Sequence, residues 1–329
     1  MKYVMLYITS FVFGGVGAWS VAKHGSRLGL LDIPNERSSH EIPVPIPKGG
    51  GIGILAAFVL SSLVLKISAS FWVPAIFLAL FSFFGDKVDL SPNLRLPVQF
   101  IAALFLLAPL LFSDSLSILC PLPSGLWLLP LTVFIVGTAN FYNFMDGING
   151  IAGITGVVGF GLVAFYAYLS GVGSSFGTLA ICMSLSCLGF LPFNIPRARV
   201  FMGDVGSILL GFVFAGMVVW LAKSFLNFVC MTGFLFPFYA DELTTMYVRL
   251  SDRENLTRPH RRHLYQLLAN EMRIDHWKVS VEYGVLQFAV GVNILLFKDM
   301  GSIAVISMLA IYFAGFAGLT CAVRKRLGG

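Results

Sequence analysis

The stretch that decides the fold is LWLLPLTVFIVGTA, Leu126–Ala139, which passes without a break into NFYNFMDGING, Asn140–Gly150. The first part is apolar and carries no charge, whereas the second holds three asparagines and an aspartate. An apolar run of this kind suits a helix in hydrocarbon, where polar groups are costly and face a cavity or a partner. The junction therefore predicts a membrane helix that ends at a polar site.

The same apolar character extends along the whole chain. Its 329 residues are 57% hydrophobic and 12% charged, with a mean hydropathy of +0.85. Soluble domains are about a quarter charged, so we predict an all-α, polytopic integral membrane protein with residues 1–329 as one catalytic domain. The eleven candidate transmembrane segments are Tyr3–Val21, Gly50–Leu65, Phe71–Phe84, Leu96–Phe112, Leu126–Ala139, Ile151–Leu169, Phe176–Leu191, Gly206–Leu221, Phe228–Met246, Val279–Phe297 and Ser302–Val323.

Lysines and arginines collect on one side of this topology. The connections 22–49, 85–95, 140–150, 192–205 and 247–278, with the tail from Arg324, hold 18 of the 22, and the other side holds 4. Because positive charge marks the cytoplasmic side, we expect these connections in the cytoplasm. The net charge of +6 follows from this bias and predicts no nucleic-acid partner. The five cysteines lack metal-like spacing and are expected to pack in the core.

The informative polar residues lie on the same side, all five histidines included. Asn140, Asn143 and Asp146 follow one another at steps of three, so on a helix they share a face. Asp146-Gly147 and Asn149-Gly150 are also turn formers. A turn explains the last four residues of the stretch but not Asn140 and Asn143.

Two further aspartates flank apolar segments. Asp86, in GDKVDLSPNLRL, shares a helical face with Asp89, which suits a divalent cation. The alternative is a helix end in water, with Asp89 opening a turn. Asp204, in VFMGDVGSILLG, lies between glycines just before a membrane helix. It serves there either as an N-cap or as a ligand of a metal–phosphate complex.

Two basic elements complete the pattern. Lys48, in PVPIPKGGG, precedes a helix start where glycines let backbone N–H groups approach a phosphate, and a snorkelling lysine in a flexible loop is the alternative. The segment RPHRRHLYQ offers guanidinium and imidazole donors for phosphates, although a basic patch on lipid headgroups is an alternative. Its basic residues are Arg258, His260, Arg261, Arg262 and His263. Together these groups suit the binding of Mg²⁺ and a diphosphate. The sequence contains no Walker loop of the form G-x-x-x-x-G-K-S/T, so it gives no indication that ATP is used.

Four motifs on this face carry a resemblance. NFYNFMDGINGIAG, VFMGDVGSILLG, RSSHEIPVPIPKGGG and HRRHLYQ resemble those of the polyprenyl-phosphate N-acetylhexosamine-1-phosphate transferases. That family includes phospho-N-acetylmuramoyl-pentapeptide transferase and the enzymes that initiate O-antigen synthesis, and HRRHLYQ looks closest to the latter branch. The resemblance implies transfer of a sugar-1-phosphate from a UDP-N-acetylhexosamine to undecaprenyl phosphate, with release of UMP at the cytoplasmic face of the bacterial inner membrane.

The resemblance also implies roles for particular residues. Asp204 and Asp146 would bind Mg²⁺, with Mn²⁺ as the alternative metal. The residues expected to act in catalysis are Asp86, Asp146, Asp204 and His260. Those expected to bind substrate are Lys48, Asn140, Asn143, Asn149, Arg261, His263 and Asp241.

Two positions depart from the family pattern, since Gly85 and Asn149 stand where the family often has aspartates. An inactive lipid-binding relative is therefore one alternative function, and a lipid-diphosphate transporter is another. The charges stop at one face, which favours the enzyme. The sequence does not name the sugar, and the resemblance leaves GlcNAc and 6-deoxy-N-acetylhexosamines such as FucNAc or QuiNAc open. The expected partners are undecaprenyl phosphate, the UDP-sugar and the lipid bilayer, with a homodimer as an alternative to a monomer.

Overall fold

The computed structural model describes residues 3–34, 44–88, 90–113, 123–171, 173–255 and 260–328. The predictions made for Asp89 and Arg258 lie outside these residues. The helices run in chain order as α1 Val4–His24, α2 Ile52–Val64, α3 Ala69–Val88, α4 Pro92–Phe112, α5 Ser124–Phe144, α6 Ile151–Leu169, α7 Ser174–Phe190, α8 Asp204–Leu221, α9 Phe225–Gly233, α10 Phe236–Ser251, α11 Leu264–Gln266, α12 His276–Phe297 and α13 Ser302–Arg326. Two short strands, β1 Leu31–Asp32 and β2 Ile46–Pro47, pair antiparallel.

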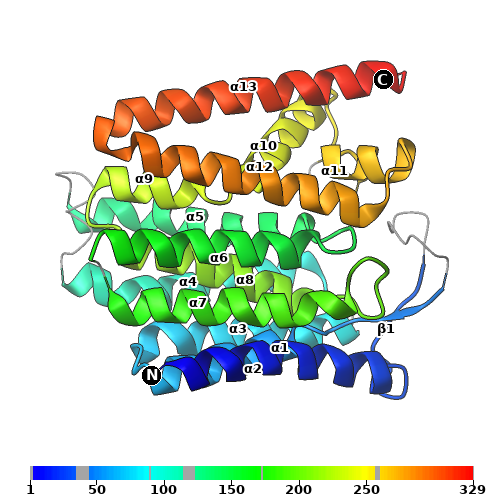
Figure 1. Cartoon of the computed structure of the whole chain (residues 1–329), viewed down its shortest axis with the longest axis horizontal. Coiled ribbons are helices and arrows are strands. Elements are labelled where there is room, and N and C mark those ends of the chain that lie inside the picture. Colours follow the sequence, from blue (N-terminus) through cyan, green and yellow to red (C-terminus); the bar gives the residue numbers. More distant parts are fainter. Residues whose placement is uncertain are drawn as a thin grey trace.

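Nine helices in the described part of the chain are long and apolar enough to cross a membrane. They are α1, α3 to α8, α12 and α13, while α2 is a shorter apolar helix. Because lipid offers no hydrogen bonds to the backbone, helices that satisfy their own N–H and C=O groups are the expected solution. The structure thus confirms the predicted all-α membrane architecture, and Figure 1 shows the helices lying side by side in one bundle.

The segment Phe228–Met246, predicted as one span, is instead two helices. α9 ends at Gly233 and α10 begins at Phe236, and neither is long enough for a span. Pro237 has no N–H and takes the second position of α10, where a proline is tolerated. The freed carbonyl of Phe234 accepts a hydrogen bond of 2.7 Å from the buried Gln287 side chain of α12.

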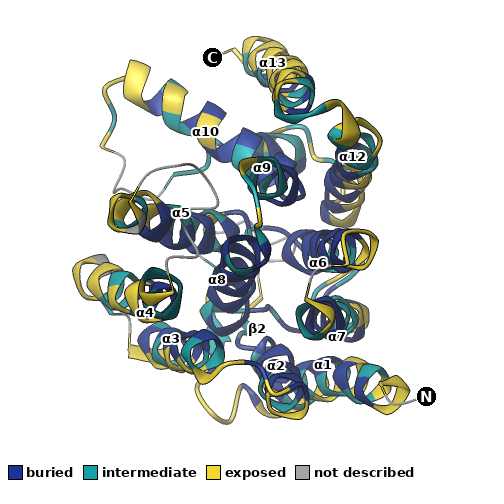
Figure 2. Cartoon of the chain, turned by 90° about the vertical axis from the view of Figure 1, so that its left-hand side faces the viewer, coloured by how far each residue is buried: buried dark blue, intermediate teal, exposed yellow. Residues whose placement is uncertain are grey.

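α8 is the centre of the bundle. Figure 2 shows α8 enclosed by neighbouring helices, whereas α13 lies at the periphery. In the apolar window of α8, 89% of the residues are buried inside the protein, against 17% in α13. A helix that is apolar all round belongs in such a core, so the start of α8 is a rigid base for whatever lies there.

The small β-hairpin is tied to the start of α8. Lys48 forms a parallel bridge with Phe201, and the Gly49 and Gly50 N–H groups donate to the Phe201 carbonyl at 3.2 and 2.9 Å. Gly51 donates likewise to the Met202 carbonyl at 2.9 Å. β1 and α11 lie at the same end of the bundle in Figure 1, so segments from distant parts of the sequence meet there.

Candidate functional site

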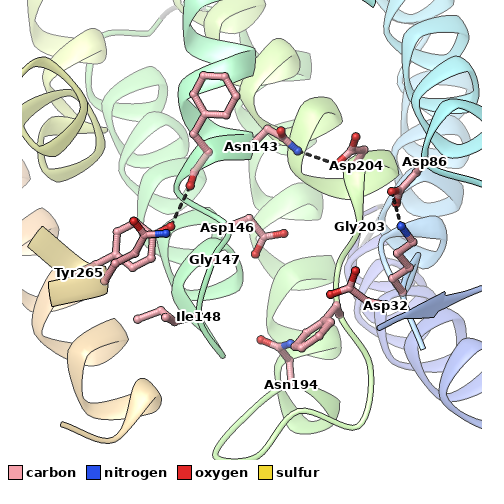
Figure 3. A pocket seen from close by; sticks show the side chains of 14 residues that line it. Asp32, Asp86, Asn143, Asp146, Gly147, Ile148, Asn194, Gly203, Asp204 and Tyr265 are labelled. Atoms are coloured by element: carbon pink, nitrogen blue, oxygen red, sulfur yellow. Dashed lines mark hydrogen bonds and ion pairs between the residues drawn. The ribbon is translucent and has the colours of Figure 1, made fainter. Parts of the chain in front are cut away.

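A cavity of about 310 Å³ is lined by residues from five of the connections that the sequence predicts on the cytoplasmic side. Figure 3 shows it between the end of α5, the start of α8 and the hairpin. Its lining residues are Asp32, Lys48, Asp86, Asn143, Phe144, Asp146, Gly147, Ile148, Asn194, Phe201, Gly203, Asp204, Tyr265 and Gln266. The helices that the sequence predicts therefore bring five of its polar candidates to one place, namely Lys48, Asp86, Asn143, Asp146 and Asp204.

Asp204 is fixed at the first position of α8. Gly203 before it has φ of +73°, a left-handed conformation that favours glycine. One carboxylate oxygen of Asp204 accepts a hydrogen bond of 2.9 Å from the Asn143 amide, and the other pairs with the Arg95 guanidinium. Arg95 is itself held by the carbonyls of Gly85 and Leu90, each at 3.0 Å. Asp204 is thus placed by α4, α5 and its own helix.

Lys48 and Asp86 form a second charged pair in the cavity wall. The Lys48 ammonium lies 2.6 Å from an Asp86 carboxylate oxygen, and both side chains are about one-fifth exposed. Burial opposes the charge of Lys48, but its hydrogen bond to Asp86 and the charges of Asp32 and Asp204 outweigh burial and raise its pKa. The ammonium is therefore a fixed positive charge beside the cavity.

Asp146 differs from these aspartates because its carboxylate has no hydrogen-bond or ion-pair partner among the described residues. It follows the end of α5 and points into the cavity (Figure 3). Burial, followed by the nearby charge of Asp204, raises its pKa well above the usual range of a carboxyl group. Asp146 is partly buried, and a carboxylate held away from water without a partner is costly. A bound cation is what would relieve the cost.

The donor set around Asp146 fits Mg²⁺. No group of three or more His, Cys, Asp or Glu within the described ranges could hold a metal by itself. Mg²⁺ in nucleotide sites is usually held by one or two carboxylates together with substrate phosphates and water. Asp146 and Asp204 offer that number of carboxylates, and both line the same cavity.

Asn140 and Asn149 do not line the cavity. Asn140 exchanges hydrogen bonds with Gln99 of α4, at 2.6 and 3.3 Å, and so joins two membrane helices. Asn149 is buried in the turn before α6, where its backbone carbonyl accepts from Ser280 at 2.7 Å and its amide lies 3.4 Å from the Pro196 carbonyl. In this structure both amides join elements of the fold.

The segment with His260, Arg261 and His263 lies behind the cavity wall. His263 is buried, with its ring nitrogens 3.4 Å from Asp241 and 3.6 Å from Glu242. Burial opposes protonation of His263, but these two carboxylates outweigh it and raise its pKa. Burial and the charges of His263 and nearby arginines lower the pKa of His260 to about 4, so His260 is neutral near pH 7.

Asp241 is fully buried and does not line the cavity. Its carboxylate accepts hydrogen bonds from the backbone N–H groups of Leu264 and Tyr265, at 2.9 and 3.2 Å, and from the Tyr283 hydroxyl at 2.7 Å. It therefore anchors the start of α11. The α11 residues that reach the cavity are Tyr265 and Gln266.

Sequence reasoning missed several residues of the site: Asp32, Arg95, Asn194, Phe201, Tyr265 and Gln266. A signal existed for two of them. Asp32 opens the polar stretch that ends in the Gly-Lys loop, and Arg95 is a lone charge at the start of an apolar helix, where an unpaired cation is costly. The others depend on how the loops fold over one another.

Comparison with known proteins bears on this geometry. The chain matches the family described as glycosyl transferase family 4 over residues 68–222, a span that contains Asp86, Asn143, Asp146 and Asp204. An undecaprenyl-phosphate alpha-N-acetylglucosaminyl 1-phosphate transferase of Thermotoga maritima is 29% identical over 76% of this chain and 75% of its own length. The chain thus resembles the polyprenyl-phosphate N-acetylhexosamine-1-phosphate transferases, both in this segment and along most of its length.

Two further relatives extend the match across the family. A Bacillus subtilis protein described as a probable undecaprenyl-phosphate N-acetylglucosaminyl 1-phosphate transferase is 25% identical over 99% of this chain and 94% of its own length. A phospho-N-acetylmuramoyl-pentapeptide-transferase of Staphylococcus saprophyticus is 30% identical over 48% of this chain and 50% of its own length. Together with the apolar helices, these matches indicate a membrane-bound glycosyl-1-phosphate transferase.

Proposed function

We propose that this protein transfers N-acetylhexosamine-1-phosphate from a UDP-sugar to undecaprenyl phosphate, releases UMP, and thereby initiates an O-antigen or another cell-surface polysaccharide. GlcNAc or a 6-deoxy-N-acetylhexosamine is the proposed sugar. One observation carries the proposal. The Asp146 carboxylate, which has no partner among the described residues, lies at the same cavity as Asp204, and Lys48 and Arg95 place two fixed positive charges near them. The names of the relatives supply the substrate class.

The charges around the cavity support a divalent cation. Asp32, Asp86, Asp146 and Asp204 lie there with Lys48 and Arg95, so fully ionised carboxylates outnumber the cations by two. Such a site repels a diphosphate unless added positive charge balances the excess. We propose that Asp146 and Asp204 hold Mg²⁺, or Mn²⁺ in its place, which would neutralise phosphate charge as the bond to phosphorus breaks.

The chain's own residues then bind and orient the reactants. Lys48 lines the cavity and would face phosphate oxygens there, with its position set by Asp86. Arg95 adds a second positive charge through its pair with Asp204. Asn143 fixes the Asp204 carboxylate. Phosphoryl transfer depends mainly on such positioning and charge neutralisation. A phosphate monoester near pH 7 is largely dianionic, so the acceptor needs no strong base to remove a proton.

The reaction itself is a displacement at phosphorus. An oxygen of the undecaprenyl phosphate attacks the β-phosphorus of the UDP-sugar, and the bond from that phosphorus to the bridging oxygen breaks. UMP leaves with the bridging oxygen, and the sugar-1-phosphate stays on the lipid as a diphosphate. The role proposed for Arg261 and His263 is to add positive charge behind the wall formed by Tyr265 and Gln266, whereas His260, which is neutral near pH 7, would add a hydrogen-bonding group there.

A second, apolar cavity suits the prenyl chain of the acceptor. It has a volume of about 780 Å³ and lies between α5, α9, α10 and α13. Phe141 of α5 lines this cavity, and Phe144, one helical turn further on, lines the polar one. The two residues share a face of α5. A lipid whose tail lies along α5 would therefore present its phosphate near Asn143, at the end we propose to face the cytoplasm.

Substitution of the two aspartates tests the proposal. The purified protein is incubated with Mg²⁺, undecaprenyl phosphate and a panel of UDP-N-acetylhexosamines, and UMP release is measured. We expect Asp146→Asn and Asp204→Asn each to lower kcat by about a hundredfold or more, because a group that acts on the transition state is lost. Removal of divalent cations with EDTA should abolish turnover.

Asp299→Asn is the matched control, because this aspartate is exposed beside Lys298, outside both cavities. It should leave UMP release unchanged. Full activity of the Asp146 and Asp204 variants would contradict the proposed site. Lipid binding by the wild-type protein without turnover on any donor would favour a transporter or an inactive lipid-binding relative instead.

A further inference from the structure

Tyr265 joins two parts of the site that are far apart in sequence. Its ring is fully buried, and its hydroxyl donates a hydrogen bond of 2.9 Å to the backbone carbonyl of Phe144. Phe144 is the last residue of α5, where the final carbonyls have no partner within the helix. The tyrosine therefore caps α5 from outside, and Asp146 follows two residues later (Figure 3).

The other end of Tyr265 is equally fixed. Its backbone N–H and that of Leu264 donate to the buried Asp241 carboxylate. The ring also stacks on His263, with ring centroids 5.5 Å apart and planes 19° apart. Since Asp241 belongs to α10, the tyrosine transmits the position of α10 to the end of α5.

Gly147 shows how closely the tyrosine fits over the loop. A Cβ atom at this position would lie 2.2 Å from the Tyr265 hydroxyl and 3.0 Å from its ring. Any side chain at residue 147 would displace the hydroxyl from the Phe144 carbonyl. The glycine after Asp146 is thus required by its contact with Tyr265.

From these contacts we propose that Tyr265 is a positioning residue, which holds the end of α5 and the following loop so that Asp146 faces Asp204 across the cavity. The proposal rests on the function proposed above, in which these aspartates act on the diphosphate. Asp241 is the anchor of this arrangement and acts through Tyr265. Misplacement of a catalytic group mainly removes transition-state stabilisation, so kcat should respond more than KM.

Hydrogen–deuterium exchange of the full-length protein in nanodiscs tests the placement directly. Tyr265→Phe keeps the ring and removes only the hydroxyl. We expect the amides of residues 145–151 to exchange about fivefold faster in this variant, since one net hydrogen bond no longer opposes local opening. In the UMP assay, kcat should fall about tenfold while KM for the UDP-sugar stays within about twofold.

Tyr312→Phe is the matched control. This hydroxyl accepts a 2.9 Å hydrogen bond from Asn293 between α12 and α13, so its loss also removes one tyrosine contact but leaves both cavities untouched. Exchange at residues 145–151 should match that of the wild type. Equal exchange in the Tyr265 and Tyr312 variants would overturn the proposal.

Gly147→Ala keeps the proposal falsifiable if Tyr265→Phe does not fold. It should accelerate amide exchange in the same loop. The double variant Gly147→Ala/Tyr265→Phe should exchange no faster than Gly147→Ala alone, because both substitutions break the same contact. Additive effects would show that the glycine and the tyrosine act separately, against the proposal. Absence of UMP release from the wild type would refute the proposed function, whereas the exchange data alone decide the role of Tyr265.

Discussion

Arg95 shows how a single residue can organise the charges of the site. Its guanidinium donates to two backbone carbonyls, of Gly85 and Leu90, and pairs with Asp204. Three of its five N–H donors are engaged by described residues, which leaves donors for a phosphate. The two carbonyls hold the guanidinium in place independently of Asp204.

Arg95→Lys should therefore be far from conservative. An ammonium group cannot bridge three acceptors in a fixed plane. We expect kcat/KM for the UDP-sugar to fall about a hundredfold, or about 2.7 kcal/mol of transition-state stabilisation. The kcat/KM value is measured by steady-state UMP release, with Arg326→Lys in the last turn of α13 as the matched control. Retention of wild-type kcat/KM by Arg95→Lys would show that only the charge matters.

Sequence reasoning reached three of the four aspartates of the cavity because each of the three borders an apolar run, where an ionisable group is conspicuous, and it missed Asp32. Asp86, Asp146 and Asp204 were found in this way, and the structure places them around one cavity. Asn140 looked equivalent by spacing, but it pairs with Gln99 of a neighbouring helix. Which face of a helix meets which neighbour is a property of tertiary packing, so spacing alone did not separate it from Asn143.

At the scale of elements, the Gly-Lys loop and the start of α8 pack closely against each other. Gly203 has positive φ, and a Cβ there would lie 2.8 Å from the Gly49 nitrogen. The loop carries Lys48, and the helix begins with Asp204. One contact between two backbones therefore sets the spacing of a cation and a carboxylate.

Gly203→Ala should separate these two elements. The left-handed conformation costs a non-glycine residue about 1–2 kcal/mol, and the overlap with Gly49 adds about 1–3 kcal/mol. We expect a lower thermal unfolding midpoint in detergent and a loss of most UMP release. Gly29→Ala is the control, because Gly29 has φ of +70° with nothing within 4 Å of its added Cβ. Equal destabilisation by both variants would mean that the backbone conformation alone matters.

The sequence predicted the elements themselves well, since ten of the eleven apolar segments correspond to single helices. The exception, Phe228–Met246, broke at Gly233 and Pro237, residues that are tolerated inside many membrane helices. At the break, the Phe234 carbonyl accepts a hydrogen bond from Gln287, which lies on a different helix. A local pattern does not reveal such a distant partner.

At the scale of the whole molecule, α5 connects two cavities of different polarity. Polar groups surround the end of the helix, and apolar groups surround its middle. The one-sided distribution of Lys and Arg predicted where the polar cavity would lie. The apolar cavity was not predicted, because it arises from the way α10 and α13 stand away from α5, and Figure 2 shows α10 inclined to its neighbours.

Because the two cavities are separate, we predict that a substitution can weaken binding of the lipid acceptor without changing binding of the UDP-sugar donor. Gly137 lines the apolar cavity, and an added Cβ there meets nothing within 4 Å. Gly137→Phe should therefore fill space that the prenyl chain would occupy without disturbing the fold. Loss of contact with about two CH₂ groups is worth about 1.6 kcal/mol, so KM for undecaprenyl phosphate should rise about tenfold.

The measurement is UMP release at varied acceptor, with KM for the UDP-sugar expected to stay within about twofold because the polar cavity is unchanged. Gly125→Phe is the control, since Gly125 also lies on α5 with open space around its added Cβ but outside the apolar cavity. The effect should shrink with short prenyl phosphates, whose tails do not reach residue 137. A rise in KM of equal size for both substrates would place the prenyl chain elsewhere and leave the apolar cavity without this role.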